Sequence, residues 1–127
     1  MNKYKIVAIV QVYNELEKGN LKRFFKYIKD SVDDVVVYDD CSTDGSYEYA
    51  MQNAREVIRG VKNDFGSELH HKQLLLSAAL KLNPDYILSI DADEVLSTGG
   101  GEALQRLCAQ SDSEEIDGLD FHLINLW

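Results

Sequence analysis

The stretch Val35-Val36-Val37-Tyr38-Asp39-Asp40-Cys41-Ser42-Thr43-Asp44-Gly45-Ser46 joins a short apolar run to an acidic turn. An apolar, β-branched run bounded by turn residues is typical of a strand buried on both faces. Helical spacing follows at once, with Tyr47, Ala50, Met51 and Ala54 on one face. A buried strand, a turn and a helix in this order indicate one repeat of a parallel α/β sheet.

The strand–helix pattern recurs along the whole chain. Apolar runs predict further strands over residues 6–12, 56–61 and 86–90, and a partial alternation predicts a fifth over 118–127. Helical spacing predicts helices over 21–32, 67–82 and 102–110. In the second of these, Ser67 is the expected N-cap, and the expected buried face consists of Leu75, Leu76, Ala79 and Leu82. The fold class predicted is therefore α/β: a mainly parallel, doubly wound sheet with helices on both faces.

Length and charge restrict the classes of function. The 127 residues are enough for one domain. Asp and Glu number 22 against 13 Lys and Arg, and the net charge of −9 argues against binding to nucleic acid or to an anionic membrane surface. No apolar run is long enough for a membrane span, and we recognise no secretory signal. The two cysteines fit no metal spacing, which favours a reducing cytoplasm.

Polar and acidic residues follow three of the predicted strands. They are Tyr13-Asn14-Glu15, Asp39-Asp40 and Asp91-Ala92-Asp93-Glu94. Parallel strands end at one edge of a sheet, which is where such sheets bind ligands, so these residues should gather there. The resulting repulsion would be relieved by Mg²⁺ or Mn²⁺. With the period of two that a strand has, Asp91 and Asp93 point to the same side, so both can face one bound group. The alternative is structural: Asp39-Asp40 begins a turn and Thr43-Asp44 caps a helix.

Several motifs are missing, and this narrows the chemistry. The sequence contains no Gly-x-Gly-x-x-Gly after the first strand, no Walker lysine motif and no Gly-x-Ser-x-Gly elbow. His71 and Lys72 fall in the first turns of the helix over 67–82 and are candidates for a phosphate contact. Cys41 lies among carboxylates that disfavour a thiolate, so we interpret it as a small neutral spacer.

The ordered motifs resemble a known family. A valine-rich strand ending Tyr13-Asn14-Glu15, the segment 35–46 and the segment Ile87–Glu94 together are similar to the nucleotide-binding half of a family 2 glycosyltransferase of the GT-A fold. The resemblance covers nearly all of the chain, and its most specific part is Asp-Asp-x-Ser-x-Asp-Gly-Ser. It implies a nucleoside-diphosphate sugar as donor, most often a UDP-sugar.

The resemblance also implies roles for the matched residues. Tyr13 would flank the base, with Glu15 beside the nucleotide, and either Asp39 or Asp40 would hydrogen-bond the base; the sequence leaves that choice open.

On the phosphate side, Asp91 would contact the ribose, and Asp93, with Asp91 beside it, would hold the Mn²⁺ or Mg²⁺. Lys72 falls where the family often has a basic residue near the nucleotide.

The family's usual reaction is inverting, and its general base lies well downstream of the Asp-x-Asp motif. Here the chain ends 34 residues after Asp93, and no acidic residue in that stretch matches the base motif. We therefore expect residues 1–127 to be one truncated GT-A-like domain that binds the donor and transfers no sugar alone. The acceptor is unknown, and a longer parent could associate with a membrane.

Two alternatives remain open at this point. One is a non-catalytic nucleotide-binding module of the same fold. The other is a receiver-like signalling domain, which needs an acidic pair after the first strand and an aspartate after the third. Here the first strand ends Asn14-Glu15 and the third ends near Gly60-Val61-Lys62, which disfavours a receiver.

Overall fold

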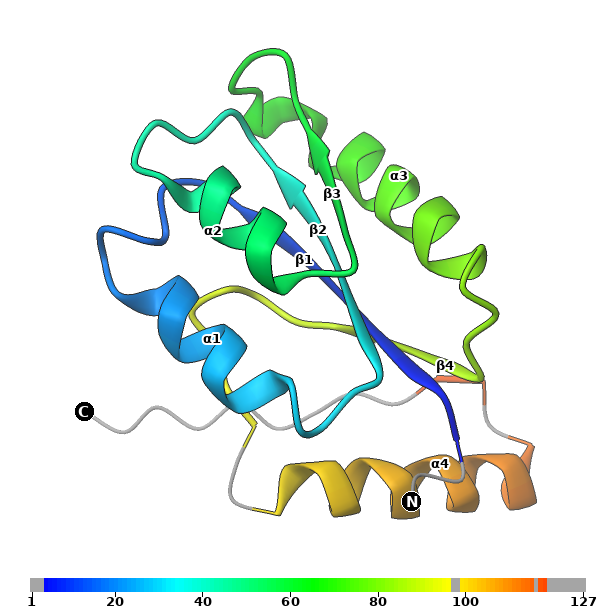
Figure 1. The fold of residues 1–127 in the computed structure, drawn as a ribbon. Helices are drawn as coiled ribbons and strands as arrows, with labels where there is room; N and C mark the ends of the chain where they lie inside the picture. Colours follow the sequence, from blue (N-terminus) through cyan, green and yellow to red (C-terminus); the bar gives the residue numbers. More distant parts are fainter. Residues whose placement is uncertain (1–3, 97–98, 116, 119–127) are drawn as a thin grey trace.

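A four-stranded parallel sheet forms the centre of the protein. The computed structural model describes residues 4–96, 99–115 and 117–118. The strands are β1 (Ile6–Val12), β2 (Asp34–Asp39), β3 (Glu56–Arg59) and β4 (Tyr86–Ser89). Their order in the sheet is β3-β2-β1-β4, and every neighbouring pair is parallel (Figure 1).

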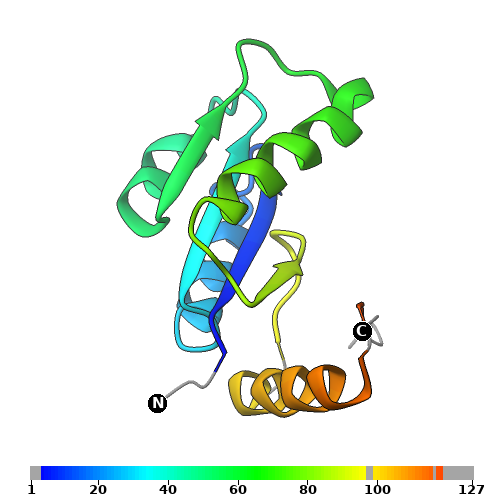
Figure 2. The ribbon, with the colours of Figure 1, turned by 90° about the vertical axis from the view of Figure 1, so that its right-hand side faces the viewer.

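Helices cover both faces of this sheet. They are α1 (Asn20–Ile28), α2 (Ser46–Asn53), α3 (Glu68–Leu80, after the 3-10 turn Phe65–Ser67) and α4 (Gly100–Glu114). Figure 1 shows α1 and α2 on one side of the sheet and α3 on the other. The predicted doubly wound α/β fold class is thus confirmed. Figure 2 places α4 beyond the amino-terminal end of the strands, where Gln105 hydrogen-bonds the backbone of Tyr4.

The central strand β1 is apolar on both sides because both of its faces are covered. Alternate residues from Ile6 to Val12 pack with Phe24 of α1. The residues between them, Val7 and Ile9, pack with Leu75 of α3. The period of two follows from the pleat of a strand, in which successive side chains point to opposite faces.

Five sequence-based expectations need correction or lie outside the described residues. The first helix ends at Ile28, earlier than expected, and α4 is longer than expected. Leu76 is 41% exposed although Leu75 is buried, because neighbouring helical positions differ by about 100° and the sheet covers only one stripe of α3. Ser67 directly precedes α3, but its hydroxyl donates to Asp64 (2.7 Å) instead of capping the helix. The predicted fifth strand lies almost wholly outside the described residues.

The strand order creates a switch point at the carboxyl edge of the sheet. From β1 the chain proceeds to β2 and β3 on one side, and β4 then joins β1 on the other side. Ligands of open parallel sheets bind where the strand order reverses in this way. The loops after β1 and β4 therefore flank the expected binding position. Within the described residues, no helix is long and apolar enough to cross a bilayer.

Candidate functional site

All the sequence-predicted site residues lie at the carboxyl edge of the sheet or beside it. Two belong to the loop after β1, two stand at the end of β2, two belong to the turn after β4, and one lies near the start of α3. They are Tyr13, Glu15, Asp39, Asp40, Asp91, Asp93 and Lys72. The fold therefore brings together three acidic segments that are far apart in sequence.

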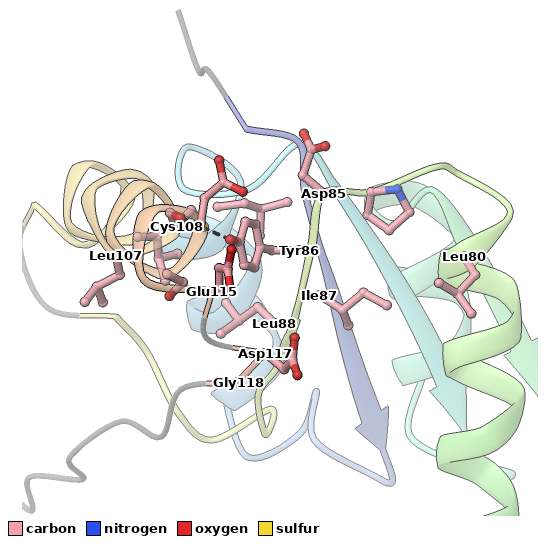
Figure 3. Close-up of a pocket in the computed structure, with 15 residues that line it drawn as sticks. Leu80, Asp85, Tyr86, Ile87, Leu88, Leu107, Cys108, Glu115, Asp117 and Gly118 are labelled. Atoms are coloured by element: carbon pink, nitrogen blue, oxygen red, sulfur yellow. Dashed lines mark hydrogen bonds between the residues drawn. The ribbon is translucent and has the colours of Figure 1, made fainter.

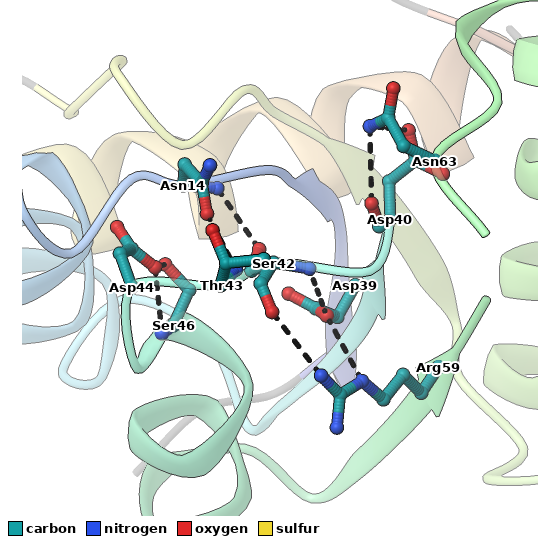
Figure 4. A network of polar contacts seen from close by, with 9 residues as sticks. All are labelled: Asn14, Asp39, Asp40, Ser42, Thr43, Asp44, Ser46, Arg59 and Asn63. Carbon is teal, nitrogen blue, oxygen red and sulfur yellow. Dashed lines mark hydrogen bonds and ion pairs between the residues drawn. The ribbon is translucent and has the colours of Figure 1, made fainter. Parts of the chain in front are cut away.

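Asp39, the last residue of β2, is a buried carboxylate with one unsatisfied oxygen. Its exposed fraction is 0%. Oδ2 accepts a hydrogen bond from the amide of Ser42 (3.0 Å) and lies 3.7 Å from Nε of Arg59 (Figure 4). Oδ1 has no hydrogen-bond partner among the described residues. A buried acceptor without a donor is costly, so this oxygen is suited to receive one from a ligand.

Asp40 has a different role, although it adjoins Asp39. It is also buried, but both of its oxygens are engaged. Oδ2 accepts from the side-chain amide of Asn63 (2.9 Å), and Oδ1 accepts from the backbone amide of Asp64 (3.1 Å). Asp40 thus fastens the loop between β3 and α3 to the end of β2. The structural alternative, in which a carboxylate organises a turn, describes Asp40 well.

Side-chain hydrogen bonds tie the loop after β1 to the loop after β2. The amide of Asn14 donates to the hydroxyl of Ser42 (2.9 Å), and the side-chain oxygen of Asn14 accepts from the amide of Thr43 (2.8 Å). The buried hydroxyl of Ser46 accepts from the amides of Glu15 (3.1 Å) and Leu16 (3.0 Å). These contacts place Tyr13 and Glu15 next to the acidic turn.

Asp44 completes this network at the start of α2. Its carboxylate accepts from the amides of Ser46 (2.9 Å) and Glu17 (2.9 Å), while Gly45 occupies the N-cap position with no side-chain cap of its own. Burial alone would raise the pKa of Asp44, but the bonds from Glu17 and Ser46 outweigh it and lower that pKa. The expected capping role of Thr43-Asp44 is therefore carried by Asp44, from one residue before the N-cap.

The acidic residues after β4 lie in an exposed turn. Asp91 and Asp93 are exposed on either side of buried Ala92. The amide of Glu94 donates to the carbonyl of Asp91 (3.0 Å), so this segment is a turn, and the expectation that the strand pattern continues through it is wrong. Burial, with the negative charges of Glu94 and Asp93, raises the pKa of Asp91. The like charges are thus crowded, as at a cation site.

The start of α3 approaches this turn with mixed charge. Lys72 lies 4.0 Å from Glu68, and both charges act on the pKa of Asp91. His71, by contrast, is buried, and its ring stacks on Tyr38 with centroids 4.0 Å apart. The expectation that His71 contacts a phosphate is therefore wrong, because its ring packs between α3 and the sheet. Lys72 remains a candidate for a phosphate contact.

The described carboxylates do not form a metal site by themselves. Across the described part of the chain, no three or more His, Cys, Asp or Glu residues could hold a metal ion together. Asp91 and Asp93 nevertheless fit the way in which proteins usually hold Mg²⁺, with one or two carboxylates while water and substrate phosphates supply the other ligands. A cation at such a site would take ligands from the substrate as well as from the protein.

One pocket of the described surface lies away from this edge. A pocket of about 600 Å³ runs beside the amino-terminal half of β4, between Leu80 of α3 and Leu107 of α4 (Figure 3). Tyr86 borders it and donates its hydroxyl proton to the carbonyl of Cys108 (3.0 Å). This pocket is at the opposite end of β4 from Asp91 and Asp93, so it does not coincide with the acidic edge.

Four residues of the site were given no individual role from the sequence, although two of them, Asn14 and Ser46, belong to the quoted motifs. Asn14 and Ser46 join the loops, Asn63 binds Asp40, and Arg59 pairs with Asp39. Of these four, Arg59 could best have been noticed in the sequence, because it is a charged residue at the end of a weakly apolar strand. Only the register of β2 with β3, which sets Arg59 directly opposite Asp39, shows its partner.

The fold and this edge define a doubly wound α/β domain with acidic residues at its switch point, and the comparisons specify the family. The chain matches the profile described as Glycosyl transferase family 2 over residues 7–118, and it belongs to this family. This membership decides against the receiver-like alternative. A search among curated proteins gave no match.

Solved structures show the same fold. S. aureus TarS is 21% identical with a TM-score of 0.64, and the match covers 93% of this chain and 23% of TarS. Residues 1–349 of TarS in complex with UDP are 24% identical with a TM-score of 0.59, covering 87% of this chain and 33% of that one. The complex of the same TarS residues with UDP-GlcNAc is 22% identical, with a TM-score of 0.58 and coverages of 87% and 32%. The chain thus spans about a third or less of these structures.

Proposed function

We propose that this chain is the donor-binding part of a glycosyltransferase that uses a nucleoside-diphosphate sugar, a UDP-sugar being the best candidate, together with Mn²⁺ or Mg²⁺. One observation carries the proposal: in a family 2 chain, crowded and exposed carboxylates stand at the switch point of the sheet. TarS, whose fold is similar, has been crystallised with UDP and with UDP-GlcNAc, which supports this donor class.

The base would bind between the loops after β1 and β2. Tyr13 and Glu15 belong to the first loop and would flank the nucleotide. Between the two candidates for the base contact, Asp39 is favoured, because Asp40 has both oxygens engaged while Asp39 has one unsatisfied acceptor. An N–H group of the base would satisfy it.

The diphosphate would lie toward the turn after β4. Asp91 would contact the ribose, and Asp93, with Asp91 beside it, would hold the divalent cation. When bound, such an ion offsets the negative charge that develops on the diphosphate leaving group. Lys72, at the start of α3, would add a positive charge on the same side.

The remaining parts of the reaction are proposed from family membership. Transfer would be inverting, with an acceptor hydroxyl as nucleophile and a general base from outside residues 1–127. Residues 1–127 would then act as one donor-binding unit of a larger catalytic domain. The cysteines described, Cys41 and Cys108, are both free, which supports a cytoplasmic site of action.

Calorimetry with UDP, with and without Mn²⁺, tests the donor site. We expect binding that needs the cation, and Asp93→Asn should remove the metal dependence while leaving thermal unfolding unchanged. Asp30→Asn, which alters an exposed aspartate at the end of α1, is the matched control and should bind like the parent. UDP binding that is absent, or indifferent to Mn²⁺, would contradict the proposal.

A further inference from the structure

The outward side of α1 gathers positive charge in a chain that is acidic as a whole. Residues 18–30 contain five of the 13 lysines and arginines but only one of the 22 aspartates and glutamates, Asp30. All five basic side chains are exposed, while the apolar residues of the helix are buried. These five residues form what we call the basic face of α1: Lys18, Lys22, Arg23, Lys26 and Lys29.

Acidic residues of the protein compensate little of this charge. Among the ion pairs of the described residues, only one includes a member of the basic face: Nζ of Lys18 lies 3.8 Å from Oε1 of Glu15. Exposed Glu17 and Asp30 adjoin the basic face at its two ends in the sequence. The neighbouring helix α2, on the same side of the sheet, contains one acidic residue, Glu48 (Figure 1). An excess of positive charge therefore remains on this side.

The spacing of the lysines works against the stability of the helix. Lys22 and Lys26 are four residues apart, and Lys29 follows three residues later, so the three ammonium groups lie along one line of α1. Like charges at these spacings destabilise a helix, whereas a face that serves solubility alone can intersperse both signs. The arrangement therefore indicates a partner that supplies the negative charge.

An aromatic side chain beside the lysines indicates what kind of partner this is. Tyr27 is 51% exposed, and Nζ of Lys26 lies 5.3 Å from the centre of its ring. Lysines together with an exposed aromatic ring suit the surface of a lipid bilayer, because the ring enters the headgroup layer while the ammonium groups stay at the lipid charges. A planar surface of this kind can also contact α1 without wrapping around the acidic remainder of the molecule.

We propose that the basic face of α1 is a docking surface for an anionic lipid membrane, with peripheral and reversible binding. The net charge of −9 disfavours such binding for the chain as a whole. A membrane nevertheless acts mainly on the charges close to it, because salt at physiological strength screens charges beyond about 8 Å. Since α1 follows the loop after β1, docking would hold the carboxyl edge of the sheet near the membrane.

Co-sedimentation with lipid vesicles tests the proposal. The 127-residue protein should bind vesicles made of equal parts of phosphatidylcholine and phosphatidylglycerol, and added NaCl should release it. Vesicles of phosphatidylcholine alone should bind it far more weakly. The double variant Lys22→Gln and Lys26→Gln should weaken binding to the anionic vesicles by about twentyfold, since each lysine near such a surface contributes about fivefold.

The matched control changes two exposed lysines outside α1, as Lys62→Gln and Lys81→Gln. It has the same net charge as the α1 variant and should keep the parent's binding. Absence of binding to anionic vesicles, equal binding to both kinds of vesicle, or an equal loss in the two double variants would overturn the proposal.

Two further titrations separate this surface from other sites. If the α1 variant loses affinity for a single-stranded DNA oligonucleotide while its vesicle binding is unchanged, the partner is nucleic acid and the membrane proposal is wrong. The inference does not rest on the proposed donor site. Calorimetry with UDP should therefore give the same result for the α1 variant as for the parent, whether or not vesicles bind.

Discussion

Two acidic turns at the same edge of the sheet have opposite surroundings. The turn after β2, residues 39–46, is largely buried, and its carboxylates accept bonds from backbone amides and side chains. The turn after β4, residues 91–94, exposes Asp91 and Asp93 to solvent. The pKa shifts differ as well: hydrogen bonds lower the pKa of Asp44, whereas partial burial of its carboxyl group and the nearby charges of Glu94 and Asp93 raise the pKa of Asp91.

The comparison shows how one residue type serves two purposes. After β2, the carboxylates accept hydrogen bonds from surrounding donors, and these bonds fix the conformation of the loops. After β4, the carboxylate of Glu94 accepts from the amide of Asp91 (2.9 Å), but among the described residues no side chain or amide donates a hydrogen bond to the carboxylates of Asp91 and Asp93. These like charges repel one another, so a cation would improve their environment. This contrast agrees with the proposed function, in which the first turn would contact the base and the second would hold the metal.

The largest expected difference between the two turns is in stability. Asp39→Ala removes the partner of a buried amide and of Arg59, and it should lower the free energy of unfolding by about 2 kcal/mol. Asp93→Ala alters an exposed side chain and should change it by less than about 0.5 kcal/mol. Urea unfolding followed by circular dichroism measures both. Equal effects of the two substitutions would contradict the contrast.

Two serines, one after β2 and one at the end of β4, give a second comparison with a smaller expected effect. Ser46→Ala leaves the amides of Glu15 and Leu16 without their acceptor, which should cost about 1–2 kcal/mol of unfolding free energy. Ser89→Ala, at the exposed end of β4, is the control and should be nearly neutral. If Ser46→Ala were as stable as the control, the network between the loops would not contribute as described.

The smallest expected effects concern pH, and they have opposite signs. The folded-state pKa of Asp44 lies below the unfolded value of 3.8, so its contribution is present above pH 3.8 and is lost as the pH falls through the lowered value. The folded-state pKa of Asp91 lies above 3.8, so its contribution is present below pH 3.8 and is lost as the pH rises through the raised value.

Asparagine substitutions make these signs measurable. At pH 7 and without metal, Asp44→Asn should be less stable than the parent and Asp91→Asn more stable. Both differences should shrink in acid, and solvent screening keeps both small. Thermal unfolding of the parent and the two variants from about pH 2.5 to about pH 7 gives the slope of stability against pH for each protein. This range covers the titration of the carboxyl groups. Slopes of the same sign for the two variants would show that the turns do not differ electrostatically.

Much of the fold could be predicted from the sequence, and the reasons are local. The run over residues 6–12 was predicted as a strand and forms β1 with the same bounds. Its apolar residues are continuous because both faces are covered, and that pattern needs no knowledge of distant residues. The buried face of α3 was predicted less well: Leu75 is buried and Leu76 is exposed, since helical spacing does not say how wide a stripe the sheet covers.

The candidate site divides in the same way. The sequence predicted that acidic segments follow three strands. It also predicted that these segments meet at one edge of the sheet, because parallel strands run in the same direction. The partners and the exposure of the individual side chains could not be predicted from the sequence. Asp39 and Asp40 are adjacent, yet one pairs with Arg59 and the other with Asn63, and His71 stacks on Tyr38.

The sequence by itself determined the alternation of strands and helices, the family, and the edge of the sheet at which the acidic residues lie. Only the tertiary structure decided which carboxylates are buried, which have donors and which are exposed to solvent. The physical reason is that apolar periodicity is a local property, whereas a carboxylate's partners come from other strands and loops. The register that sets Arg59 opposite Asp39 exists only once β2 and β3 have paired.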